Sequence, residues 1–295
     1  MKDSSWEIMN LLRQYNGDSK AVLRDHPDLE CLYALSDMRE NLLEWFPFRE
    51  DASLLQVGSD YGALTGLYSR RVSHVTVLDP SWDNVLVNRE RWEKNGNITY
   101  IQGGMEQLEN LEGIFDYIVF AGTLGAEESS EDRNKPSAQG EKQEEDFPDR
   151  AEELQFSEAG AKAQLAQAVK LLAPQGVIFC AAANPLGIKY QTGAKTQGCT
   201  MTRSRLLQAF QAAGDGTLEF YYPMPDWKIP ITIYSDGRLP QKGELSHQLM
   251  AYDYPRYLRF EPGKVLDMIC EENQFPAFAN SFLVIWSSHE ENKLC

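Results

Sequence analysis

The chain has 295 residues, 42% of them hydrophobic, and its 44 acidic side chains outnumber 28 basic ones to give a net charge of −16. This length and hydrophobic content suffice for one large α/β domain with additions. The negative charge argues against a nucleic-acid partner, which needs a concentrated basic face. The apolar runs fall short of the roughly 20 residues that cross a bilayer, so no membrane partner is expected.

The N-terminal sequence and the cysteines indicate a cytoplasmic protein. The polar start MKDSSWEIMN lacks the basic region, apolar core and cleavage site of a secretory leader. The five cysteines are scattered and have no CxxC spacing. This pattern predicts reduced thiols and no zinc or other metal site.

Hydrophobic periodicity predicts the elements of the first half of the chain. Residues 4–46 carry apolar residues at i, i+3 and i+4, as in WEIMNLLRQY, and predict a helical cap over residues 1–50. Strands are then predicted at ASLLQV, HVTVLD, ITYIQ and FDYIVFAG, with helices at ALTGLYSRRV and WDNVLVNRERWEKNG between them. This alternation indicates βαβ units and a mostly parallel sheet that is covered on both faces.

A charged segment interrupts the pattern at about 126–155. It is poor in apolar residues and has no period, so it predicts a disordered or mobile insertion that a protein partner could order. Beyond it, helices are predicted at AGAKAQLAQAVKLLAPQG, TRSRLLQAFQAAG and KVLDMICEEN, and strands at VIFCAAA and SFLVIWSS. Residues 51–295 are therefore expected to form one α/β domain that carries the acidic insertion.

The turn after the first predicted strand, VGSDYGALTG, predicts a cofactor site. A GxGxxG nicotinamide fingerprint needs glycine at three positions, where the chain has Gly58, Asp60 and Ala63. A GxGxG turn that receives S-adenosylmethionine keeps two of its three glycines, Gly58 and Gly62. Glycine lets backbone amides approach a ligand with no Cβ in the way. The sequence therefore favours S-adenosylmethionine over a nicotinamide.

Asp79 ends the second predicted strand, HVTVLD, and is followed by Pro80. It lies about 20 residues after the turn, where a carboxylate accepts both ribose hydroxyls of a nucleotide cofactor. An aspartate at this position can instead cap the following helix. The turn upstream favours the ribose role.

Four motifs in order, LLQVGSDYGALTG, VTVLDPS, FDYIVFAGTL and AVKLLAPQGVIFCAAAN, resemble those of class I S-adenosylmethionine-dependent methyltransferases. LSDMRENLLEWFPF, NPLGIKYQTGAK, FYYPMPDWKIPITIYSDGRLP and FANSFLV more closely resemble a bacterial group found beside, or fused to, glycosyltransferases of surface-polysaccharide synthesis. The resemblance covers most of the chain outside the insertion. It implies a Rossmann-like fold with a seven-stranded, mostly parallel sheet whose last strand, SFLVIWSS, runs antiparallel.

The resemblance also implies where the cofactor binds. Adenine is expected at GGMEQL, where Met105 either packs on the ring or fills the core. Residues 121–123 are expected beneath the methyl-donor sulfur. From the cap, Tyr33 or Arg39 either reaches the cofactor's carboxylate or belongs to a solvated helix face. The residues expected to hold the cofactor are Tyr33, Arg39, Gln56, Gly58, Ser59, Asp60, Gly62, Asp79, Pro80, Gly104, Met105, Glu106, Ala121 and Gly122.

Some features depart from the family pattern. Gln56 stands where a carboxylate usually helps to hold the cofactor's cationic amino group, and Asp60 is a candidate for a displaced counter-ion. Gly104 stands where an acidic residue is common near the adenine. The chain runs almost directly from TQGC to TMTRSRLL and omits an acidic-His segment that would supply the general base.

Three residues are candidates for the missing base. Lys189 and Tyr190 follow the fifth predicted strand, at the edge where ligands of α/β sheets bind, and Asp226 lies in YYPMPDWK. Tyr222 and Trp227 form either an acceptor-facing wall or, as we favour, a rigid buried hairpin. Because the sulfonium is already activated, alignment in a dry pocket can supply much of the acceleration without a base.

The sequence thus predicts an enzyme that methylates a small-molecule or glycan-linked acceptor. Oxygen is the favoured atom, because no Asn/Asp-Pro-Pro-Tyr/Phe turn follows FDYIVFAG. The alternative is a catalytically weakened homologue that serves as a cofactor-binding or partner-binding regulatory subunit. A nicotinamide oxidoreductase is disfavoured by the glycine spacing.

Overall fold

The protein is described by a computed structural model over residues 4–127, 155–196, 198–246, 253, 258 and 260–288. The predicted insertion at about 126–155 therefore lies almost wholly outside the described residues. Within these ranges, no helix has the length and apolarity that crossing a membrane requires. The same ranges bring together no three His, Cys, Asp or Glu side chains in a metal-binding arrangement.

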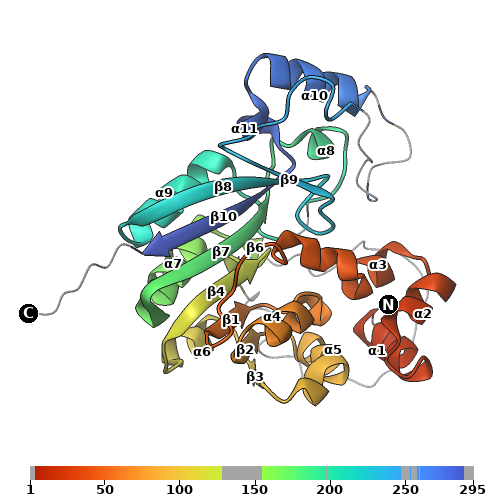
Figure 1. The fold of residues 1–295 in the computed structure, drawn as a ribbon, viewed down its shortest axis with the longest axis vertical. Helices are drawn as coiled ribbons and strands as arrows, with labels where there is room; N and C mark the ends of the chain where they lie inside the picture. Colours follow the sequence, from red (N-terminus) through yellow and green to blue (C-terminus); the bar gives the residue numbers. More distant parts are fainter. Residues whose placement is uncertain are drawn as a thin grey trace, which may run out of the picture.

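An eight-stranded sheet forms the centre of the molecule (Figure 1). Its spatial order is β3-β2-β1-β4-β7-β10-β8-β9. The strands are β1 (Ser53–Val57), β2 (His74–Asp79), β3 (Ile98–Gln102), β4 (Phe115–Ala121), β7 (Leu172–Ala183), β8 (Gly216–Met224), β9 (Thr232–Ser235) and β10 (Ser281–Ser288).

The strand directions confirm the predicted fold class. β1, β2, β3, β4 and β7 are parallel, and β10 runs antiparallel to both of its neighbours, β7 and β8. The sheet has eight strands where seven were expected. The additional strand, β9, arises because the proline-rich segment after β8 folds back and pairs Thr232 with Met224.

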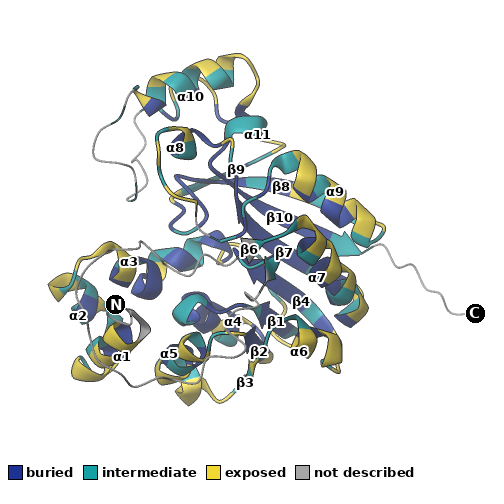
Figure 2. Ribbon diagram, turned by 180° about the vertical axis from the view of Figure 1, so that it is seen from behind, coloured by how far each residue is buried: buried dark blue, intermediate teal, exposed yellow. Residues whose placement is uncertain are grey.

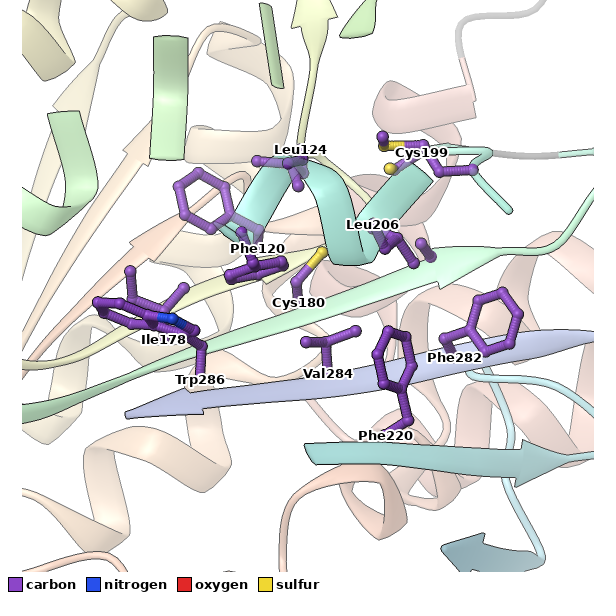
Figure 3. Close-up of a cluster of buried hydrophobic side chains, with 14 of the residues drawn as sticks. Phe120, Leu124, Ile178, Cys180, Cys199, Leu206, Phe220, Phe282, Val284 and Trp286 are labelled. Carbon is purple, nitrogen blue, oxygen red and sulfur yellow. The ribbon is translucent and has the colours of Figure 1, made fainter. Parts of the chain in front are cut away.

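Helices cover both faces of the sheet because successive strand residues point to opposite sides. Leu54 packs with residues of α4 (Thr65–Arg71), whereas Leu55 belongs to the cluster under α7 (Glu158–Leu171) and α9 (Arg203–Ala213). β1, β2, β4 and β10 are accordingly buried along most of their length, whereas the edge strands β3 and β9 are mostly half-buried or exposed (Figure 2). Figure 3 shows Cys180, Val284 and Phe220 on neighbouring strands, on the side that faces Leu206 of α9.

The predicted helical region at the N-terminus is confirmed, as several short helices. α1 (Ser4–Gln14), α2 (Ser19–Asp25) and α3 (Leu29–Leu35) are followed by the 3-10 segment η1 (Asp37–Leu42). Asp18 and Asp28 cap α2 and α3 by accepting backbone N–H groups. α1 packs on α5 (Trp82–Trp92), so this region lies beside the first half of the sheet (Figure 1). The division into a cap over 1–50 and a domain over 51–295 stays a prediction.

Short elements complete the described structure. Hydrophobic periodicity did not predict α6 (Met105–Asn110), α8 (Ile188–Gln191) or α11 (Phe275–Phe278), because each spans fewer than two helical turns. The predicted helix at KVLDMICEEN is α10 (Pro262–Glu271). The remaining elements are η2 (Asp60–Gly62), η3 (Glu93–Asn95) and the strand pair of β5 (Ala126–Glu127) and β6 (Gln155–Phe156).

Candidate functional site

The candidate site lies at the carboxyl ends of the parallel strands, where the strand order reverses. β1 has β2 and β3 on one side and β4 and β7 on the other. Ligands of open α/β sheets bind at such a switch point. The turn at 58–62 leaves β1 there, so its position agrees with the sequence prediction.

The turn at 58–62 has a left-handed backbone at four of its five residues. Gly58 and Gly62 have φ of +78° and +75°, and Asp60 and Tyr61 have φ of +44° and +57°. Asp60 thus adopts the conformation of the glycine that it replaces, which aspartate tolerates better than most residues. Sequence reasoning missed Tyr61, for which this region is strained.

Helix α5 holds this turn in place. The Arg91 guanidinium donates to the carbonyl of Tyr61 at 2.7 Å, and the Trp92 indole N–H donates to the carbonyl of Gly62 at 2.8 Å. Burial, followed by the nearby Arg39, lowers the pKa of Arg91 to about 10. The turn is therefore fixed by side chains that no motif around Gly58 reveals.

Gln56 faces the helices below the turn. Its side-chain oxygen accepts from the Thr65 hydroxyl at 2.8 Å, and the Asn88 amide donates to that hydroxyl at 2.9 Å. The three side chains are buried and tie β1 to α4 and α5. A role for Gln56 at the cofactor's amino end stays a prediction, and in this conformation its oxygen is occupied by Thr65.

Asp79 ends β2 as predicted, and its carboxylate is buried at the strand end. One oxygen accepts from the backbone N–H and hydroxyl of Ser59 at 2.6 and 2.7 Å, and the other accepts from the Ser81 N–H at 2.9 Å. The Asn84 amide approaches both oxygens at 3.3 and 3.4 Å. Burial raises the pKa of Asp79 although these donors favour the carboxylate.

The structure shows contacts of Asp79 at the start of α5, and its ribose role stays a prediction. The carboxylate receives the Ser81 and Asn84 groups at the start of α5, as a helix-capping residue would, and it also receives the turn residue Ser59. A ribose would need to replace the Ser59 hydroxyl or share its acceptor. Pro80, the next residue, is exposed.

The residues expected near adenine begin helix α6. Gly104 is the N-cap residue of α6, and its backbone N–H donates to the Gln107 side chain at 3.2 Å. Met105 is half-buried against the core cluster under α7, and Glu106 is exposed. Of the two alternatives for Met105, core filling describes its packing, and contact with adenine stays a prediction.

The glycines of the site are covered by side chains of the chain itself. A Cβ on Gly58 would collide with the Thr123 side chain, and a Cβ on Gly122 would lie 2.5 Å from the Trp227 ring. Gly198 packs on the carbonyl of Gly122, to which the Cys199 N–H donates at 2.7 Å. Gly198 and Cys199, in the segment before α9, thus pack against the end of β4.

Arg39 reaches the turn from η1 and is only 1% exposed, so the alternative of a solvated helix face is wrong for this residue. Its guanidinium donates to Asp60 at 2.8 Å and to the carbonyl of Tyr33 at 2.7 Å, and it lies 5.5 Å from the centre of the Trp227 ring. Burial opposes ionisation of Asp60, but the charges of Arg39 and Lys228 outweigh it and lower its pKa. Contacts of Tyr33 and Arg39 with the cofactor stay predictions.

Two of the three candidate bases form a buried ionic group. The Lys189 ammonium lies 2.5 Å from Asp226 and 2.7 Å from Asp253, and the other oxygen of Asp226 accepts the Lys228 and Ile229 N–H groups. An ammonium between two carboxylates is not a free base. Their catalytic roles stay predictions, and the geometry assigns them a structural contact.

Tyr190, the third candidate base, lies beside this group. It is half-buried, and the Lys189 ammonium is 5.4 Å from the centre of its ring. The cavity between them has a volume of about 10 Å³ and is lined by Lys189, Tyr190, Lys195, Asp226, Trp227, Lys228 and Asp253. This volume holds about one water molecule, whereas ligand pockets measure about 300–1,000 Å³.

Tyr222 and Trp227, expected together as one wall or hairpin, lie in different places. Tyr222 is buried against Phe275 and Phe282, and its hydroxyl donates to Asp236. Trp227 is buried at the carboxyl ends of the strands. The predicted burial is confirmed for both residues, but only Trp227 belongs to the candidate site.

The residues at this edge fit S-adenosylmethionine in part. Asp79 and the left-handed turn at 58–62 have the chemistry and backbone geometry that a ribose and a nearby backbone contact need. The Thr123 and Trp227 side chains fill the space that a Cβ on Gly58 and Gly122 would take, and Arg39 donates to one oxygen of Asp60. In the described conformation these residues therefore pack against one another at the expected methionine end of the cofactor.

Comparisons with known proteins agree with this fold. Residues 54–135, which contain β1 to β4, match the family model of a methyltransferase domain. No curated protein matches the chain. The turn at 58–62 and Asp79 lie within the matched residues.

Several solved methyltransferase structures resemble this chain. Phosphoethanolamine N-methyltransferase 1 of Haemonchus contortus, solved with phosphoethanolamine and S-adenosylhomocysteine, aligns with a TM-score of 0.50 at 11% identity, over 97% of this chain and 51% of that one. The methyltransferase in complex with the Trm112 activator of Haloferax volcanii has a TM-score of 0.49 at 14% identity, over 97% and 100%. The N-methyltransferase NodS of Bradyrhizobium japonicum, solved with S-adenosylhomocysteine, aligns with a TM-score of 0.47 at 13% identity, over 98% of this chain and 100% of that one. At such identities the likeness establishes the fold alone.

Proposed function

We propose that the chain is an S-adenosylmethionine-dependent methyltransferase that acts on a small-molecule or glycan-linked acceptor, at an oxygen atom, in a bacterial cytoplasm. The observation that carries the proposal is the methyltransferase domain over β1 to β4, with Asp79 at the end of β2 beside the left-handed turn at 58–62. The strand order of the sheet supports the same function. The domain match and the strand order concern the methyltransferase function only and say nothing about the acceptor.

Sequence features support the finer part of the proposal. The likeness of the flanking segments to a group associated with polysaccharide glycosyltransferases favours a glycan-linked acceptor. β4 is followed by Gly122, Thr123 and Leu124 rather than by an Asn/Asp-Pro-Pro turn, which favours oxygen over nitrogen. A protein partner at the acidic insertion belongs to the proposal as well, and neither nucleic acid nor membrane does.

Within this proposal Tyr190 is the residue that meets the acceptor. Lys189 and Asp226 are committed to each other, to Asp253 and to backbone N–H groups, so they position the loop after β7 against the loop after β8. Tyr190 follows Lys189 and lines the small cavity at this junction. Its phenol can orient an acceptor hydroxyl, and in the phenolate form it can accept the proton of that hydroxyl.

The second candidate function, a regulatory subunit with weakened catalysis, is favoured by one specific observation. Two residues expected at the methionine end of the cofactor, Asp60 and Gly122, are in contact with Arg39 and Trp227. A protein in which this arrangement never opens would keep the fold and lose the reaction. Turnover separates the two functions.

Calorimetric titration with S-adenosylmethionine and S-adenosylhomocysteine tests the proposal. We expect micromolar binding that Asp79→Ala abolishes. Asp116→Ala is the matched control, because Asp116 also accepts a backbone N–H, from Ser53, but lies at the amino ends of the strands. It should bind both ligands like the parent.

The outcomes separate the two functions. Binding followed by methyl transfer to a hydroxylated glycan in an acceptor screen supports the enzyme, and binding without turnover on any acceptor supports the regulatory subunit. If neither the parent nor any folded variant binds either ligand, both functions are wrong as stated.

A further inference from the structure

Arg39 places a buried positive charge at the cofactor edge of the sheet. A guanidinium removed from water is costly unless its N–H groups are bonded and its charge is paired. Here one arm donates to Asp60 at 2.8 Å and the other to the carbonyl of Tyr33 at 2.7 Å. Asp60 thereby loses one carboxylate oxygen to the chain's own cation.

Trp227 covers the neighbouring position. Its ring lies on Gly122 and under the Arg39 guanidinium, and it is held by a loop that is anchored on both sides. On one side the Asn280 amide donates to the carbonyl of Pro225 at 2.8 Å, and on the other Asp226 accepts the Lys228 and Ile229 N–H groups. The ring position is therefore built into the fold.

Arg39 and the cofactor's ammonium group have the same kind of interaction to offer. Each is a cation that donates N–H groups to a carboxylate, and Asp60 is the candidate counter-ion for the cofactor's ammonium group. One oxygen cannot serve both fully. Full pairing of this oxygen with the cofactor's ammonium therefore requires the Arg39 guanidinium to release it.

We propose that Arg39, Asp60 and Trp227 form a latch that closes the cofactor site in the free protein and that must open before S-adenosylmethionine binds. The latch consists of the Arg39–Asp60 ion pair and the Trp227 ring that packs on Gly122 beneath it. In the open state Trp227 leaves Gly122, and Asp60 exchanges the guanidinium for the cofactor's ammonium. The inference rests on the proposed function, which supplies the ligand.

The latch has a quantitative consequence. When the binding-competent state is a minor fraction of the population, the apparent dissociation constant is the intrinsic one divided by that fraction. A minor state typically holds about 0.1–10% of the molecules. Removing the latch should therefore tighten apparent binding by about tenfold or more. It should also remove any ceiling on the association rate that opening imposes.

Trp227→Leu is the decisive variant, because it removes the ring from Gly122 and leaves Arg39, Asp60 and Asp79 intact. Trp227→Phe is a milder second variant in case the first does not fold. Trp45→Leu is the matched control: Trp45 is 43% exposed, stacks on Tyr221, and lies in the segment that follows η1. Association of S-adenosylhomocysteine is followed by stopped-flow fluorescence, and affinity by calorimetry.

We expect the parent and Trp45→Leu to associate at a rate that levels off with ligand concentration. The Trp227 variants should associate at a rate that stays linear and should bind about tenfold more tightly or better. Equal rates and affinities in the parent and a folded Trp227 variant would overturn the latch and leave the proposed function standing. Binding by a Trp227 variant but not by the parent supports both, whereas no binding by any folded protein overturns the proposed function and the latch with it.

Discussion

The indole of Trp227 lies against Gly122 at the carboxyl end of β4, so closely that a Cβ on Gly122 would stand 2.5 Å from Cη2 of the ring. The glycine is therefore needed by the chain itself, whatever ligand it also serves. The same holds at Gly58, where the Thr123 side chain takes the space of a Cβ. Gly58 and Gly122, which the sequence analysis placed at a cofactor, thus also allow close packing between parts of the chain itself.

Replacing Gly122 tests this packing. Gly122→Ala adds a methyl group to a left-handed residue with φ of +79° and drives it into Trp227. Gly96→Ala is the matched control, with φ of +76° and no heavy atom within 4 Å of the added Cβ. The control should lose about 1–2 kcal/mol of unfolding free energy from its backbone alone. Gly122→Ala should lose a further 1–3 kcal/mol or so from overpacking, measured by urea denaturation. Equal losses would show that the ring yields freely.

The buried Lys189 should matter more than an exposed lysine. Lys189→Met leaves the Asp226 and Asp253 carboxylates buried without their cation and should cost about 3–5 kcal/mol of unfolding free energy. Lys242→Met removes an exposed ammonium 2.7 Å from Glu271 and should cost about 0–1 kcal/mol. Both losses of unfolding free energy are measured from the shift of the denaturation midpoint, provided that the m-value stays constant. Similar losses in the two variants would contradict the buried ionic group.

Asp60 should contribute a pH-dependent stability. Burial raises the pKa of Asp60, but the charges of Arg39 and Lys228 lower it by a larger amount. Its pKa in the folded protein therefore lies below its unfolded value. The ionised carboxylate therefore contributes stability above the unfolded pKa, near 4, and this contribution is lost as the pH falls through the folded pKa. The difference in unfolding free energy between the parent and Asp60→Asn should shrink in acid. A difference that stays constant from pH 6 down to pH 3 and below would refute the ion pair.

Tyr222 should act in stability and not in binding. Tyr222→Phe removes a buried hydroxyl that donates to Asp236 and accepts from Arg203 at 3.2 Å, and should cost about 1–2 kcal/mol. The affinity for S-adenosylhomocysteine should stay the same, because the ring packs on Phe275 and Phe282, away from the turn at 58–62. A weaker affinity in this variant would return Tyr222 to the candidate site.

Much of the fold was predictable from local sequence. HVTVLD and SFLVIWSS correspond to β2 and β10 residue for residue, because a buried strand requires a continuous apolar run that can be recognised in the sequence. Neither β8 nor the return strand β9 was predicted from periodicity, because prolines and aromatics interrupt the pattern of this segment. Short helices such as α6 span too few turns to show a period.

Within the site, the sequence by itself determined the positions of the turn at 58–62 and of Asp79, because both follow from the end of a strand. Only the tertiary structure decided what these residues touch. Arg39 bonds to Asp60 across 21 residues of sequence, and Trp227 reaches Gly122 from the loop after β8. Hydrophobic periodicity predicts which side chains are buried, but it does not predict which residues distant in sequence they contact. That choice is made when the cap and the later strands pack on the sheet.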